Sequence, residues 1–114
     1  VVTNGTLTVA DGGTLGGGNV RVCTNATLRI LTSTAIADTA TVELVNIGTK
    51  YGKVYLTNGV LETVSGVILG GSLNTTPGTY GSTASGAAHK DDNYFAGPGK
   101  LKIAGNPGTI VWVL

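Results

Sequence analysis

Short runs in which aliphatic residues alternate with polar ones recur along the chain, and matched runs lie about 21–26 residues apart. Successive side chains of a β-strand point to opposite faces, so each run would bury one face and expose the other. Fixed periods of this length are typical of stacked β-coils. The matched positions are Leu7 with Leu28, Val20 with Val42, Leu28 with Val54, and Val42 with Val67.

This pattern predicts an all-β protein with Gly- and Asn-rich turns, because Val, Ile and Thr favour pleated surfaces and no helical stripe of useful length occurs. We expect a short irregular β-solenoid, similar to a parallel β-helix, over residues 1–108. Residues 72–98 break the alternation and are expected to form a long Gly/Ser loop, held to the domain by an aromatic pair, Tyr94 and Phe95. A β-sandwich remains the alternative, since regularly spaced short strands are also typical of sandwiches.

The composition excludes several classes of function. Only 11% of the residues are charged and the net charge is +1, which gives no electrostatic basis for nucleic-acid binding. No apolar run reaches the roughly 18 residues of a membrane-spanning helix. The single cysteine, Cys23, has no partner for an internal disulfide. The chain contains no methionine, so we expect a processed product, extracellular or at the cell surface, whose signal peptide has been removed.

The residues offer little for catalysis. There is one histidine, no Gly-x-Ser-x-Gly motif, and the carboxylates Glu43 and Glu62 stand apart in the sequence. His89 lies beside Asp91 and Asp92, but one imidazole and two adjacent carboxylates make a poor cation cage. We therefore expect no enzyme, no cofactor and no metal, with this cluster on a solvated loop.

Two groups of segments resemble the autotransporter-associated β-strand repeat proteins, which are secreted bacterial surface proteins. Residues 53–104 resemble the C-terminal end of that family, and the early coil Gly5-Thr6-Leu7-Thr8-Val9 resembles its repeats. The resemblance implies an extracellular, non-enzymatic protein with a β-solenoid, and it carries over no catalytic residue. The segments that carry it are Val67-Ile68-Leu69-Gly70-Gly71, Pro77-Gly78-Thr79-Tyr80-Gly81-Ser82, and Asp92-Asn93-Tyr94-Phe95-Ala96-Gly97-Pro98-Gly99-Lys100-Leu101-Lys102-Ile103.

An apolar strand is predicted over residues 109–114. An exposed apolar edge strand is an aggregation hazard, so these side chains must be buried. The strand either closes its own fold or is donated to a neighbouring subunit by strand addition. The residues of this assembly strand are Ile110, Val111, Trp112, Val113 and Leu114.

Two functions follow as hypotheses. The first is a secreted structural protein, a subunit of a bacterial filament or surface assembly that binds itself by strand addition and end-to-end stacking. The alternative is an adhesin-like module that binds a glycan or another surface through residues 72–98. The contact residues expected for this alternative are Tyr80, His89, Asp91, Asp92, Tyr94 and Phe95.

Overall fold

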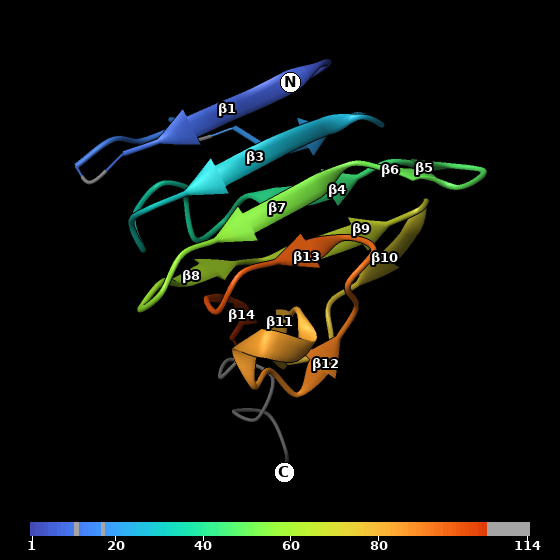
Figure 1. Cartoon of the computed structure of the whole chain (residues 1–114). Coiled ribbons are helices and arrows are strands. Elements are labelled where there is room, and N and C mark those ends of the chain that lie inside the picture. Colours follow the sequence, from blue (N-terminus) through green and yellow to red (C-terminus); the bar gives the residue numbers. More distant parts are fainter. Residues whose placement is uncertain (11, 17, 105–114) are drawn as a thin grey trace, which may run out of the picture.

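The computed structural model describes residues 1–10, 12–16 and 18–104 and shows an all-β chain (Figure 1). Within these residues the helical content is one 3-10 turn, and no helix is long and apolar enough to cross a membrane. The elements are β1 (Gly5–Val9), β2 (Val20–Val22), β3 (Ala26–Ile30), β4 (Thr41–Leu44), β5 (Asn46–Ile47), β6 (Lys50–Tyr51), β7 (Lys53–Leu56), β8 (Leu61–Val64), β9 (Gly66–Leu69), β10 (Ser72–Asn74), β11 (Gly78–Gly81), η1 (Thr83–Ser85), β12 (His89–Lys90), β13 (Phe95–Ala96) and β14 (Lys100–Ile103).

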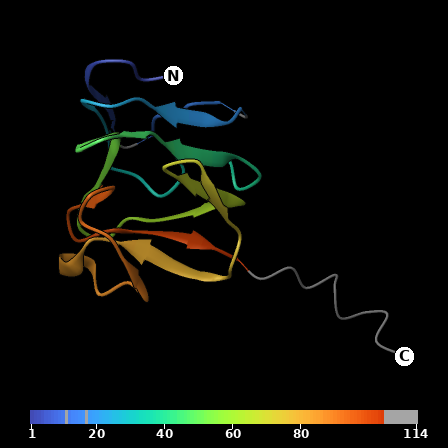
Figure 2. The ribbon, with the colours of Figure 1, turned by 90° about the vertical axis from the view of Figure 1, so that its right-hand side faces the viewer.

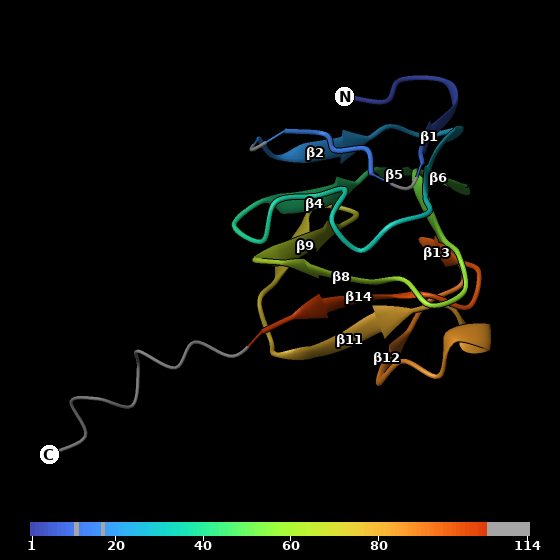
Figure 3. The same cartoon turned by 90° about the vertical axis from the view of Figure 1, so that its left-hand side faces the viewer.

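Strands from successive parts of the chain pair in parallel to form three small sheets (Figures 1 and 3). The first sheet has the order β1-β3-β7-β13, and every pair in it is parallel. The second contains the parallel series β2-β4-β9, and the third contains the parallel pair β8-β14. All four residue pairs expected from the sequence spacing are found in register.

Inward side chains form columns that run through the core from one end of the molecule to the other. The column of the first sheet takes one residue from each strand, and these residues pair in register: Leu7, Leu28, Val54 and Phe95. Leu28 and Val54 are fully buried. Burial of one such side chain is worth about 1.5–3 kcal/mol, so these columns are the main source of stability.

A two-stranded hairpin explains why the spacing of matched positions drifts. β5 and β6 pair antiparallel over residues 46–51 and form a separate sheet beside the main ladders (Figure 1). The sequence separation between paired residues is longer from β3 to β7 and from β4 to β9, and both of these stretches of chain contain the hairpin. The separation is shorter from β1 to β3 and from β2 to β4, and neither of these stretches contains it. The hairpin is therefore an insertion between paired strands that leaves their register intact.

Residues 72–98, expected as a long loop, contain regular structure, and we call them the cap segment. They contain β10 to β13 and η1. β10 pairs antiparallel with β9, and β11 pairs antiparallel with β14, so the second and third sheets change direction here. β13 instead continues the parallel first sheet beside β7. Figure 2 shows this segment at the end of the molecule opposite the N-terminus. The loop prediction was wrong because these strands are two to four residues long and carry no alternating aliphatic pattern.

The strand expected over residues 109–114 lies outside the described residues. Cys23 is a partly buried free thiol that follows β2.

Replacing Gly52 with alanine tests the close approach of the backbone before β7 to the backbone at the end of β2. A Cβ atom on Gly52 would lie against the carbonyl oxygen of Val22 and 2.9 Å from that of Cys23. Because both obstacles are backbone atoms, we expect Gly52→Ala to lower the free energy of unfolding by about 2–4 kcal/mol, measured in urea. The control is Gly18→Ala, which meets no atom within 4 Å. Equal stability of the two variants would contradict the described packing.

Candidate functional site

The first strand of the first sheet leaves one backbone edge open. β1 pairs with β3, and no described strand pairs with its other edge. Residues Gly5 to Thr8 are exposed, and only Val9 is buried. Unpaired strand edges are templates for pairing with another chain.

The inward column of the first sheet is also open at this end. Leu7 is 43% exposed, whereas Leu28 and Val54 are 0% exposed and Phe95, at the opposite end, is 1% exposed. All four occupy equivalent positions in the ladder. The difference therefore comes from what covers each end and not from the position of the residue on its strand.

A hollow of about 90 Å³ lies beside Leu7, and we call it the N-terminal groove. Its N-terminal wall is held in place by two backbone hydrogen bonds of 2.8 Å, from the N–H of Val2 to the carbonyl of Arg21 and from the N–H of Cys23 to the carbonyl of Val2. The groove is thus a fixed part of the fold. Its lining residues are Val1, Val2, Leu7, Leu15, Asn19 and Val20.

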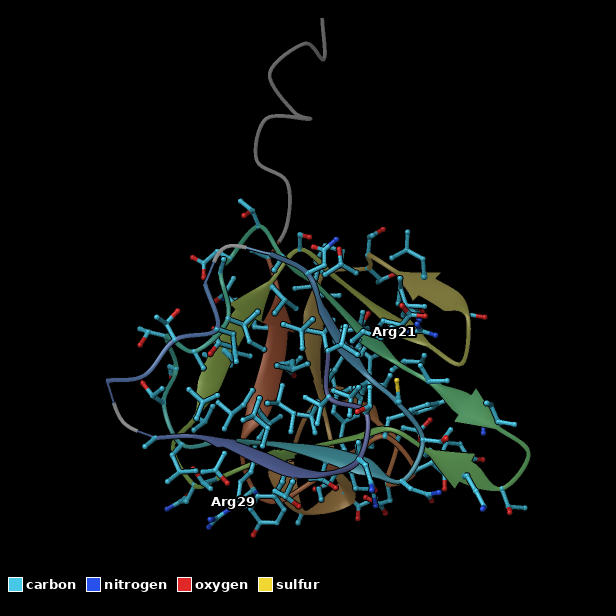
Figure 4. The ribbon with its side chains drawn as sticks, turned by 90° about the horizontal axis from the view of Figure 1, so that it is seen from above. Arg21 and Arg29 are labelled. Carbon is cyan, nitrogen blue, oxygen red and sulfur yellow. The ribbon has the colours of Figure 1, made fainter. Side chains whose placement is uncertain are left out.

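The nearest arginines point away from this groove. Seen from above, Arg21 and Arg29 lie on different sides of the molecule, outside the ring of strands (Figure 4). Arg21 pairs with Glu43 at 3.5 Å, and the guanidinium of Arg29 lies 5.6 Å from the centre of the Tyr55 ring. Both cations thus interact with the neighbouring strand of their sheet, and neither is among the residues that line the groove.

The cap segment covers the other end with the aromatic residues that the sequence suggested as surface contacts. Tyr80, Tyr94 and Phe95 are all buried. The hydroxyl of Tyr80 donates to the carbonyl of Thr76 at 2.9 Å, and Tyr94 packs edge-on against Tyr51 with centroids 5.1 Å apart. These side chains close the core, so they do not form an exposed platform.

The charged members of the expected contact set have local structural roles. His89 is exposed and stacks on the ring of Tyr80, with centroids 4.4 Å apart. Asp91 Oδ1 accepts from the N–H of Asn93 at 2.9 Å. Asp92 Oδ1 accepts from the N–H of Thr83 at 2.8 Å, and the pKa of Asp92 is lowered by this bond and by the Thr83 hydroxyl. In the described part of the chain, no three His, Cys, Asp or Glu side chains converge to hold a metal.

The sequence analysis considered Glu62 only as a carboxylate that stands apart from Glu43, and it missed that Glu62 is fully buried on β8. Its Oε2 accepts a hydrogen bond of 2.9 Å from the backbone N–H of Ala35, while Oε1 has no partner among the described residues. Burial raises the pKa of Glu62 to about 7, against the opposing effect of the Ile36 and Ala35 backbone amides, and the nearby Asp38 charge adds to the rise. The carboxyl joins β8 to residues 32–40, which form no strand.

The elevated pKa of Glu62 predicts a pH-dependent stability. In an unfolded chain this carboxyl titrates near 4.5. The contribution of Glu62 to the free energy of unfolding is therefore fully present below pH 4.5, and it is lost as the pH rises through about 7. We expect Glu62→Gln to be more stable than the parent at pH 8.5, by on the order of 2 kcal/mol, and similar to it at pH 4.5.

Denaturant unfolding across pH 4.5–8.5 measures this effect, with Glu43→Gln as the control. Glu43 is partly exposed and paired with Arg21. The control should keep the parent's pH profile, and a Glu62→Gln profile that also follows the parent would show that another group is responsible.

In comparisons with family models, with curated proteins and with solved structures, the chain gives no match. Any functional assignment therefore depends on the geometry of the chain itself.

Proposed function

We propose that this chain is a structural subunit of an extracellular assembly, joined to its neighbours by β-strand addition at the N-terminal groove. The observation that carries the proposal is the inward column of the first sheet, which is covered at Phe95 and open at Leu7. A core left open on one side is completed by further β-structure, because soluble proteins seldom leave contiguous apolar surface exposed.

The parallel ladders support the finer interpretation of the fold as a short irregular β-solenoid. The strands β1, β3 and β7 pair in parallel in the order of the sequence, as a solenoid requires. The strands β2, β4 and β9 do the same in the second sheet. Sandwiches are built from antiparallel sheets, which makes the alternative less suitable. In a solenoid each coil contacts only its neighbours, so an uncapped end is a natural site of association.

The two ends favour strand addition over end-to-end stacking. Stacking of successive copies requires two open ends, whereas the cap segment adds antiparallel strands to the second and third sheets and covers the first column with the buried Phe95. The β1 edge offers unpaired main-chain groups beside apolar side chains, which are the two elements of recognition by strand addition. The likeness of residues 53–104 to secreted bacterial surface proteins supports an extracellular location.

An adhesin-like function is the weaker candidate. Three of the six expected contact residues, Tyr80, Tyr94 and Phe95, are buried in the cap. A catalytic function has little support. Among the described residues, Glu62 is the carboxyl whose pKa is raised to about 7, and it is fully buried and out of reach of a substrate.

The proposal predicts that charge at Leu7 prevents association. We expect Leu7→Asp to weaken self-association at least tenfold, because burying a carboxylate in the groove costs more than the roughly 1.4 kcal/mol that a tenfold change represents. The measurement is light scattering after size-exclusion chromatography, with negative-stain electron microscopy of the same fractions.

Leu61→Asp is a matched control, because Leu61 is also 43% exposed but lies on β8, away from the groove. It should associate like the parent protein. A parent protein that is monomeric at all concentrations, or two variants that behave alike, would refute the proposal.

A further inference from the structure

We propose that the N-terminal groove of one copy takes residues Ile110–Leu114 of a second copy as an added strand next to β1. This inference rests on the proposed function and deepens it by naming the segment that fills the groove. The two binding partners are thus one chemical species, and each copy carries both a donor segment and an acceptor edge.

The acceptor and the donor match in length and in charge. β1 has five residues, Gly5 to Val9, and none of them is charged. The segment Ile110–Leu114 also has five residues and no charged side chain. An uncharged donor suits the groove, because five of the six residues that line it have apolar side chains and none of the six side chains is charged.

The alternation of a strand gives the donor an apolar face of the right kind. In β1 the inward positions are Leu7 and Val9, which continue the columns of Leu28 and Ile30. A strand of the donor sequence presents Ile110, Trp112 and Leu114 on one face. Placed beside β1, this face extends the columns by one further coil and covers Leu7.

The position of the groove favours a donor from a second copy. β14, the last described strand, belongs to the coil at the capped end, while β1 lies at the opposite end with β3 and β7 between them (Figure 1). To place a strand beside its own β1, the chain would have to cover four strand spacings, about 19 Å, and also pass around a sheet, within the six residues 104–109, which reach about 20 Å when fully extended. A second copy approaching the open end meets no such restriction.

Trp112 is the only tryptophan in the chain and reports directly on the donor segment. In the full-length protein we expect the fluorescence of Trp112 to move to shorter wavelength, and its quenching by acrylamide to fall, as the protein concentration rises. Leu7→Asp in the acceptor should abolish this change. Val111→Pro in the donor should abolish it too, because proline removes a main-chain donor and is poorly accepted in a paired strand. Leu61→Asp should leave it intact.

Three results would overturn the inference. If Trp112 is protected at every concentration, the segment packs within its own chain. If Trp112 stays exposed while the protein assembles, another contact joins the copies, and the proposed function survives without this donor. If the concentration-dependent shift persists in both Leu7→Asp and Val111→Pro, the donor binds somewhere other than beside β1.

Discussion

The register of the inward aliphatic columns is the constraint on which the rest of the structure depends. Side chains alternate between the two faces of a strand, so a slip of one residue between β3 and β7 would turn Leu28 and Val54 away from each other and out of the core. The columns therefore fix each strand against the next in its sheet. The hairpin at residues 46–51 shows that extra residues are accepted between paired strands where they do not enter a ladder.

The sequence predicted the ladders because their information is local and repeated. Leu7, Leu28 and Val54 each stand in an alternating run, and the matched spacing indicated which runs pair. β8 escaped prediction because its inward positions include Glu62, so a carboxyl occupies the place where an aliphatic residue was expected. In the cap segment, β11 has Tyr80 as its only large side chain, so it shows no alternation of apolar and polar residues. Its pairing with β14 depends on contacts between segments far apart in the sequence.

Glu62 also explains how residues 32–40 are held without forming a strand. The carboxyl accepts from the N–H of Ala35, and the hydroxyl of Ser33 accepts from the N–H of Leu61. These two side-chain bonds take the place of the ladder bonds that β8 would make with a neighbouring strand on that side. The carboxyl is costly when ionised, because burial removes it from water and one of its oxygens has no described partner. This part of the core is thus held by a bond whose strength depends on protonation.

The contrast between the two ends of the molecule bears on the form of the proposed assembly. One end carries the antiparallel strands β10 and β11 and the buried Tyr80 and Phe95, and the other presents the open edge of β1 and the half-exposed Leu7. If the open ends of two copies met face to face, the product would be a closed dimer to which no further copy could be added. A donor on one part of the chain and an acceptor on another make a heterologous contact, which repeats from copy to copy unless the rotation closes a ring. A polar fibre is therefore the simplest product of strand addition to a molecule with one open end.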